Sequence, residues 1–153
     1  MRIDGFDDTA DEFAEFAEGL RDVADNLDGA IDSGVETTAF QIEGTAKRIV
    51  SVDSGALRAG IEARRLSIGV WVVGAKSDYA DDVEFGTAPH VIEADQADAL
   101  AFMGQDGELV FRQRVEHPGT PAQPFLRPAL AEHQSDLVEN INDEIQKLFD
   151  TYL

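Results

Sequence analysis

The residues that could do chemistry in this sequence are three histidines and many carboxylates. His90, His117 and His133 have no second metal ligand at helical spacing. None of the 153 residues is a cysteine, which excludes a thiolate nucleophile and a cysteine-based metal site. A glycine-rich phosphate loop and the HExxH and GxSxG motifs are also absent. We therefore expect no catalytic, cofactor-binding or metal-binding residues, and we expect that the protein is not an enzyme.

The segment 78–84 is the strongest candidate for a cation site. It holds four carboxylates in seven residues, and Ca²⁺ and Mg²⁺ prefer oxygen ligands. EF-hand spacing is absent, however, and the chain has 31 acidic against 12 basic residues, so acidic clusters are expected throughout it. We expect the acids to face water: Asp78, Asp81, Asp82 and Glu84. Three other side chains are expected to pack inward: Tyr79, Val83 and Phe85.

The formal net charge of −19 is the most extreme property of the composition. Such self-repulsion destabilises a compact state in dilute buffer. At 1 M salt the Debye length falls to about 3 Å and most of this penalty disappears. The composition therefore predicts a halophilic source. It also argues against tight binding to nucleic acid phosphates, which requires clustered lysine and arginine.

Length and hydropathy bound the architecture. A chain of 153 residues is most simply one domain, 1–153, with its own core. No apolar run approaches the roughly 20 residues that cross a bilayer, so no membrane partner is expected.

Helical periodicity dominates the first third of the chain. Thr9 and Glu12 have the spacing of a capping box, and apolar residues then recur every three or four positions on one face. This pattern predicts a long helix over 9–50, with a kink near 29–34 as an alternative to a straight helix. Because its apolar stripe is longer than one small sheet can cover, part of it should pack against another chain.

The middle of the chain, 57–115, predicts a small and mostly antiparallel sheet. The β-branched and aromatic run Val70–Val73 indicates a buried central strand. Leu100–Met103 and Leu109–Val115 flank an Asp-Gly step and predict a hairpin. Within the second strand, alternation would place Leu109, Phe111 and Val115 on one face and Val110, Arg112 and Arg114 on the other.

Four of the five prolines lie in 117–130. Three of them, Pro118, Pro121 and Pro124, make 116–125 a stiff connector. Pro128 is tolerated only in the first turn of a helix, so an amphipathic helix over 126–152 should follow and pack on the sheet or on the first helix. The expected fold is therefore α+β. The connector is either an ordinary link or an arm that docks on a neighbouring subunit, and the predicted interface residues are Pro124, Phe125, Leu126 and Arg127.

Three segments together resemble a known family. They are VDSGALRAGI (52–61), YADDVEFGT (79–87) and HPGTPAQPFLRPAL (117–130). In this order and spacing they resemble the head–tail joining, or tail-completion, proteins of long-tailed phages. The resemblance covers about 46–131, with Val52 where the family often has proline and Ser54 in place of threonine. The long acidic helix lies outside it.

The resemblance implies a non-enzymatic component of the virion neck. Such a protein would form a ring, of six copies or alternatively twelve, that completes the tail and joins it to the head. Its partners would be neighbouring neck and tail proteins, with genomic DNA passing through without tight binding. The acidic composition adds the expectation of a tailed virus of halophilic archaea, assembled in the host cytoplasm.

The motif residues are expected to be architectural: Asp53, Gly55, Leu57, Arg58, Tyr79, Glu84, Phe85, Gly86 and Thr87. Gly55 and Gly86 would adopt turn conformations that are unfavourable for residues with a side chain. Asp53 would form an Asx-type turn. Arg58 and Arg127 would pair with carboxylates, Glu84 first among them. The alternatives are a tail terminator or minor tail component and, in another class, an acidic hydrolase or interaction module of the host.

Overall fold

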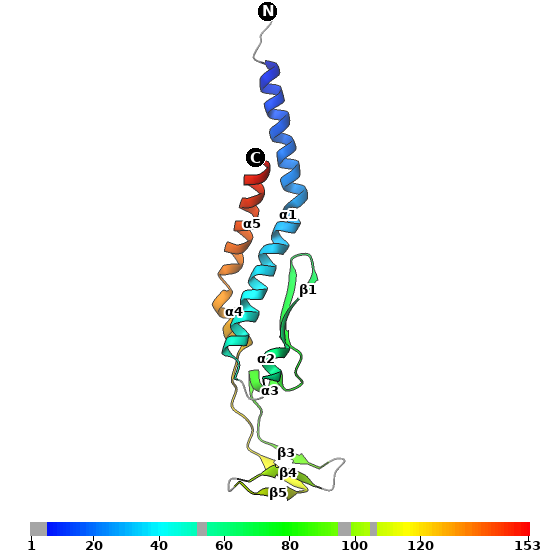
Figure 1. Ribbon diagram of the computed structural model, residues 1–153, viewed down its shortest axis with the longest axis vertical. Coiled ribbons are helices and arrows are strands. Elements are labelled where there is room, and N and C mark those ends of the chain that lie inside the picture. The colour runs from blue at the N-terminus through cyan, green and yellow to red at the C-terminus, as the bar shows by residue number, and fades with distance from the viewer. Residues whose placement is uncertain (1–5, 52–54, 95–98, 105–106) are drawn as a thin grey trace, which may run out of the picture. The chain divides into compact units, whose positions relative to one another are not determined.

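The computed structural model describes residues 6–51, 55–94, 99–104 and 107–153 (Figure 1). The fold is α+β, as predicted, with helices and three small antiparallel two-stranded sheets. The chain divides into two compact units. The first comprises 1–76 and 125–153, and the second comprises 77–124.

Helix α1, Phe6–Ile49, is the longest element of the first unit. Its 44 residues form one continuous helix through Gly29 and Gly34, about 66 Å long at 1.5 Å per residue. The helix begins before Thr9, so the prediction of Thr9 as the N-cap is wrong. The residues 6–8 include no glycine or proline that would end the helical conformation at Thr9.

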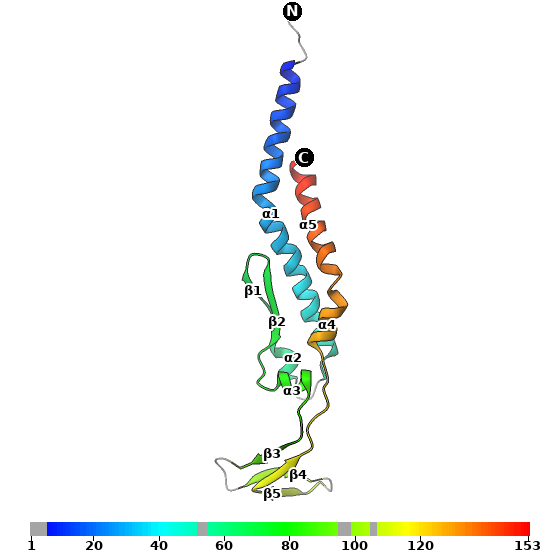
Figure 2. The same ribbon diagram turned by 180° about the vertical axis from the view of Figure 1, so that it is seen from behind.

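The C-terminal helical region runs alongside α1 and packs on it, as Figures 1 and 2 both show. It consists of α4, Leu126–His133, and α5, Asp136–Tyr152, rather than one helix over 126–152. The interruption is confined to Gln134 and Ser135, which keep right-handed helical backbone angles. The predicted start is confirmed, since α4 begins at Leu126 and Pro128 lies in its first turn.

Two glycines bring the backbones of α1 and α5 close together. A Cβ on Gly34 would lie 2.6 Å from Cα of Ile141, and a Cβ on Gly19 would collide with the carbonyl oxygen of Tyr152. A side-chain amide on α5 adds polar contacts, because Asn140 Nδ2 donates to Thr38 Oγ1 at 2.9 Å. The α1–α5 contact therefore begins at about Gly19, and the first turns of α1 extend past the end of α5.

A β-hairpin packs beside α1 in the first unit. The short helix α2, Ala56–Gly60, leads into β1, Ile61–Ser67, which pairs antiparallel with β2, Val70–Ala75. The predicted buried central strand at Val70–Val73 is wrong. Strand β2 has one partner, and Val70 and Val72 are 48% and 39% exposed because only the other face of the hairpin meets α1.

The buried apolar residues of the first unit are mostly small. They are Val23, Ala30, Ala39, Ala46, Val50, Leu57, Ile61, Phe125 and Ala129. Phe125 and Ile61 are the largest side chains that are fully buried among the described residues. This core is thin for helices of such length, and it leaves much apolar side-chain surface uncovered.

The second unit combines helix α3, Ala80–Phe85, with four short strands. Strand β3, His90–Glu93, pairs with β6, Arg114–His117, and β4, Leu100–Met103, pairs with β5, Leu109–Arg112. The hairpin is confirmed, but the strand expected over Leu109–Val115 ends at Arg112. Because the chain changes partner at Gln113, Val115 does not share a strand face with Leu109 and Phe111, both of which are exposed.

The orientation predicted for the acidic segment is wrong at three positions, Tyr79, Glu84 and Phe85. The segment is helical, so side chains four residues apart share a face. Ala80 and Glu84 are accordingly buried, and Phe85 is 61% exposed instead of packed inward. Tyr79, also expected to pack inward, is 44% exposed.

The close α1–α5 approach makes a direct prediction. Gly34→Ala should destabilise the fold by about 1–3 kcal/mol, because the backbone of Ile141 cannot yield as a side chain would. Gly29→Ala, on the same helix with nothing within 4 Å, should instead stabilise it by about 0.5–1 kcal/mol. Thermal unfolding of both variants checks this difference, and equal melting temperatures would contradict it.

Candidate interaction surface

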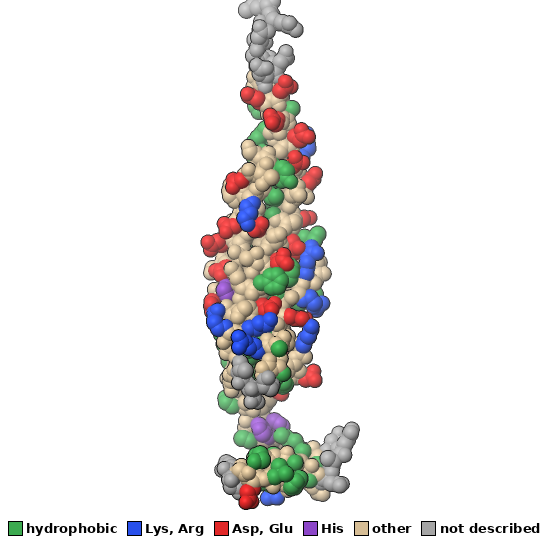
Figure 3. Space-filling model, in the orientation of Figure 1, with side chains coloured by type: hydrophobic (Ala, Val, Ile, Leu, Met, Phe, Trp, Pro, Cys, Tyr) green, Lys and Arg blue, Asp and Glu red, His purple; other side chains and the backbone are tan. Residues whose placement is uncertain are grey.

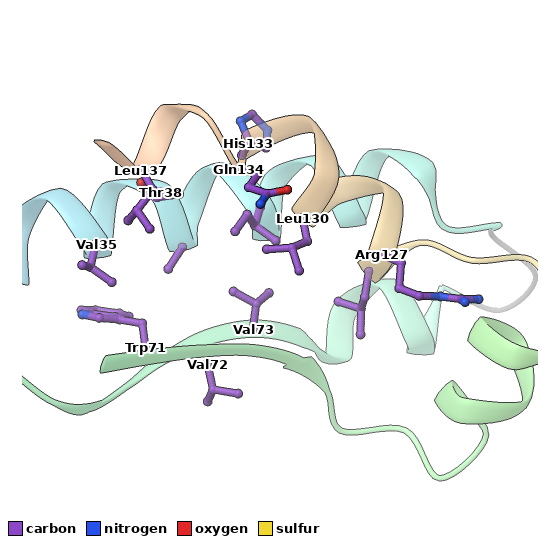
Figure 4. A pocket seen from close by; sticks show the side chains of 13 residues that line it. Val35, Thr38, Trp71, Val72, Val73, Arg127, Leu130, His133, Gln134 and Leu137 are labelled. Carbon is purple, nitrogen blue, oxygen red and sulfur yellow. The ribbon is translucent and has the colours of Figure 1, made fainter. Parts of the chain in front are cut away.

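An apolar groove of about 390 Å³ lies in the first unit over the C-terminal half of α1 (Figure 4). Val35, Ala39 and Ile42 of α1 line it. Strand β2 contributes Trp71 and Val73, and the α4–α5 region contributes further apolar side chains: Leu126, Leu130 and Leu137. Leu130 is 55% exposed although its neighbours are apolar. The groove is therefore an open hydrophobic surface framed by a helix floor, a strand and a second helical wall.

The polar groups of this groove are already engaged within the chain. Thr38 Oγ1 donates to the carbonyl oxygen of Gly34 at 3.0 Å and accepts from Asn140. Both ring nitrogens of His133, which also lines the groove, have partners. A small polar ligand would find few directed contacts here, whereas an apolar side chain would lose water without displacing hydrogen bonds.

Two carboxylates of α1 hold the hairpin wall in place. Asp32 Oδ1 accepts from the Gly69 N–H at 2.8 Å and from Trp71 Nε1 at 3.2 Å, and Arg65 pairs with its other oxygen at 2.8 Å. Eleven residues later, and so three turns along the same face, Glu43 accepts from the Ala63 N–H at 2.6 Å. Sequence reasoning missed both residues, since nothing distinguishes them among 31 acidic residues.

Hydrogen bonding sets the titration of these two carboxylates. The Gly69 N–H bond, reinforced by Arg65 and Trp71, holds the pKa of Asp32 below its ordinary value of 3.8 despite the opposing effect of burial. Burial raises the pKa of Glu43, but the bonds from Lys47 and from the Ala63 N–H outweigh it and leave that pKa lowered. Both groups therefore contribute stability in their charged forms.

Thr45, His133 and Asp136 form a hydroxyl–imidazole–carboxylate relay. Thr45 Oγ1 lies 2.9 Å from Nε2 of His133, and Nδ1 of His133 lies 2.7 Å from Oδ2 of Asp136. The order resembles that of a hydrolase triad. However, Thr45 is only 2% exposed and its oxygen also accepts from Arg48 at 3.2 Å. The relay thus joins the α4–α5 turn to α1 and presents no nucleophile.

The predicted interface residues differ in exposure. Pro124 is exposed, while Leu126 and Arg127 line the groove. Phe125 has no exposed surface in the single chain, so its ring is not available to anchor on a neighbour as expected. Its burial makes it a core residue, and the exposed apolar side chain on this helix is Leu130 instead.

The first motif falls at the entry to the hairpin. Gly55 has the positive φ expected of it, 79°, and Leu57 is buried. Asp53 lies outside the described residues. Arg58 is exposed and has no ion pair among the residues that the structure describes, so the expected pairing with a carboxylate is not seen there.

The second and third motifs meet within the second unit. The Thr87 N–H donates to the Thr120 carbonyl oxygen at 2.9 Å, Thr120 N–H donates back at 3.1 Å, and Gln123 N–H donates to the Val83 oxygen at 2.8 Å. Gly86 has φ 73° and ψ 172°, and a Cβ there would lie 2.6 Å from the Thr120 oxygen. Gly86 and Thr87 are therefore architectural, because they fasten α3 to the proline-rich connector.

Charge is unevenly distributed over the first unit (Figure 3). Residues 9–31 contain seven carboxylates and a single cation, Arg21. Seven of the 12 basic residues lie within 47–76 or at 127: Lys47, Arg48, Arg58, Arg64, Arg65, Lys76 and Arg127. The N-terminal half of α1 is thus strongly acidic, whereas most cations of the chain lie in the rest of the unit beside a similar number of acids.

Within the described ranges, no group of three or more histidine, aspartate or glutamate side chains is placed to hold a metal ion. No described helix is both long and apolar enough to cross a bilayer. The fold does present exposed apolar surface around buried architectural contacts, which is typical of a surface that contacts other proteins.

Comparison with known proteins shows a similarity to one family over part of the chain. Residues 14–86 match the family model described as "Bacteriophage HK97-gp10, putative tail-component". Over these residues, just under half of the chain, the protein is similar to the HK97-gp10-like family of phage tail components. No curated protein and no solved structure matches it.

The matched range corrects the extent of the resemblance. It includes most of α1, which sequence reasoning placed outside the family, and it ends before the third motif at 117–130. The long acidic helix is thus part of the family region.

A pH-dependent prediction follows from Asp32. Asp32→Asn keeps an acceptor for Gly69 but loses the ion pair with Arg65, so the variant should be less stable at pH 7. Since the folded-state pKa is lowered, the wild-type advantage is present above pH 4 and lost as pH falls through the folded value. Urea unfolding between pH 2 and 7 should show the two proteins converging in acid, and a constant difference would contradict this account.

Gly86 offers a second test. Gly86→Ala should cost about 1–3 kcal/mol, because its backbone angles are accessible essentially only to glycine. Amide hydrogen exchange at Thr87, Thr120 and Gln123 should then accelerate by about tenfold or more. Gly44→Ala, on α1 with nothing within 4 Å, is the matched control and should leave these amides unchanged.

Proposed function

We propose that this protein is a phage tail component, a ring-forming subunit of the head–tail neck that completes the tail and joins it to the head. Its main support is the exposed apolar surface. Twenty-three large apolar side chains are exposed among the described residues, whereas Phe125 and Ile61 are the largest that are fully buried. Exposed apolar side chains that gather into patches mark surfaces that contact other proteins.

The exposed side chains fall on both units, which suits a subunit that contacts several neighbours. In the first unit they include Phe13, Phe16, Leu130 and Val138, and in the second Met103, Leu109 and Phe111. We assign the first group to contacts between copies, in a ring of six with twelve as the alternative. The second group is suited to neighbouring neck and tail proteins, because it lies on a separate compact unit.

The same properties fit a tail terminator or another minor tail component, which remains the second candidate. Both readings require an oligomer around a central passage. They differ in the layer that the ring occupies between head and tail, which defines the partners of its two faces.

Genomic DNA would pass through this ring without being held tightly. Most cations of the first unit already have carboxylate partners, such as Arg48 with Glu132 at 3.0 Å and Lys76 with Glu62 at 2.7 Å. In the second unit, Arg114 lies 3.6 Å from Glu93. Phosphate binding requires cations that can replace counterions on the duplex, and a chain of charge −19 supplies few.

The acidic composition supports a further part of the proposal, that the virus infects halophilic archaea. At molar salt the repulsion between acidic subunits acts over about 3 Å, so assembly of such subunits is then compatible with their charge.

The purified protein tests the proposal directly. In molar salt, light scattering should give a mass several times 16.6 kDa, and negative-stain microscopy should show closed rings. A monomer at every salt concentration would contradict ring formation. Retention on double-stranded DNA throughout a salt titration would contradict the expectation of weak DNA binding.

A further inference from the structure

The first turns of α1 carry an apolar edge that the chain does not cover. Phe13 is 70% exposed, Phe16 is 53% exposed and Leu20 is 44% exposed. Their spacing of three and four residues continues the stripe that packs on α5, but α5 ends opposite Gly19. The continuous helix therefore holds these three apolar side chains in fixed relative positions, and no other part of the described chain covers them.

The groove described above matches this edge in length and chemistry. Phe13 and Leu20 are seven residues apart, and so are Val35 and Ile42 on the groove floor, about 10 Å in each case. Apolar helices that occupy grooves do so through anchors at i, i+3 and i+7, which is the spacing of this edge. The groove in turn offers apolar side chains and almost no unsatisfied polar group.

The edge cannot reach the groove of its own copy. Both lie on α1, and Phe16 is separated from Val35 by 19 residues of continuous helix, about 28 Å. An occupant with this sequence must therefore come from a second copy.

Charge favours this pairing over a symmetric one. The edge segment, residues 9–20, contains Asp11, Glu12, Glu15 and Glu18 and no cation. Two such segments side by side would bring like charges together. The region around the groove, 32–76 and 125–136, instead has nearly balanced charge, with seven cations beside six described acidic residues, and Arg127 lies in the groove lining itself. At molar salt such charges act only at contact distance, where they select the partner and its register.

We propose that the Phe13–Phe16–Leu20 edge of one copy occupies the groove between α1, β2 and α4 of the next copy. The two surfaces are different, so the contact is heterologous, and an open chain of copies has one free edge and one free groove at its two ends until a ring closes. This assignment rests on the proposed ring and names the contact that builds it.

Engineered cysteines test the pairing, because the native chain has none. Full-length Phe16→Cys and Leu130→Cys proteins are mixed in molar salt and treated with a short bismaleimide cross-linker. The expected product is a covalent dimer that contains one copy of each variant. Cross-linked dimers of Phe16→Cys alone would show symmetric pairing of α1 and overturn the proposal.

A matched control distinguishes this contact from nonspecific hydrophobic association. Phe111→Cys places the thiol at a phenylalanine of similar exposure, 57% against 53%, on the second unit, and it should not cross-link to Leu130→Cys. Light scattering provides the second measurement. Phe16→Ala should weaken association by about tenfold or more, and Phe111→Ala should not, with unchanged melting temperatures of the dissociated chains.

The outcomes distinguish this inference from the proposed function. Rings that form without a link between positions 16 and 130 would overturn the docking and leave the ring intact. Monomers in every condition would overturn both. Equal loss of association in Phe16→Ala and Phe111→Ala would show that no specific groove contact exists.

Discussion

The length of α1 is the constraint on which the rest of the structure depends. A helix of 44 residues presents a continuous apolar stripe, and this chain covers it only from about Gly19 onward. The glycines at 19 and 34 let α5 approach the backbone closely, while the hairpin is held by Asp32 and Glu43. The elements that pack on α1, the β1–β2 hairpin, α4 and α5, are all shorter than α1. The uncovered remainder defines the surface through which copies can meet.

Much of the fold could be predicted because its signals are local. The period of the long helix, the Asp-Gly hairpin and the start of α4 near Pro128 depend on residues close in sequence. The failures concern partners that no local pattern specifies. A β-branched run around Trp71 looks the same in a central strand and in a hairpin with one exposed face. Likewise, the expectation that all four acids of 78–84 face water misplaced Glu84, because the segment is helical and buries one face.

The candidate site was harder to predict, because its walls come from segments far apart in the chain. Val35, Val73 and Leu130 meet only after the hairpin and α4 have packed on α1. The sequence did indicate that α1 has surplus apolar surface, but nothing in it marked the groove that could receive this surface. The hydrogen-bonded groups around His133 show the opposite error, in which a structural arrangement resembles a catalytic site. Its groups have the order of a catalytic triad, yet the hydroxyl of Thr45 is buried and serves to fix a helix turn.

The most direct test of this account is a cryo-electron microscopy reconstruction of the virion with its neck resolved. The account predicts a closed ring of this chain around the DNA path, with the first turns of α1 of each copy seated in the groove of its neighbour. A map that places the chain on the capsid surface or at the tail tip would contradict the neck assignment. A ring in which the groove faces solvent would contradict the central claim, that the uncovered stripe of α1 is completed by another copy.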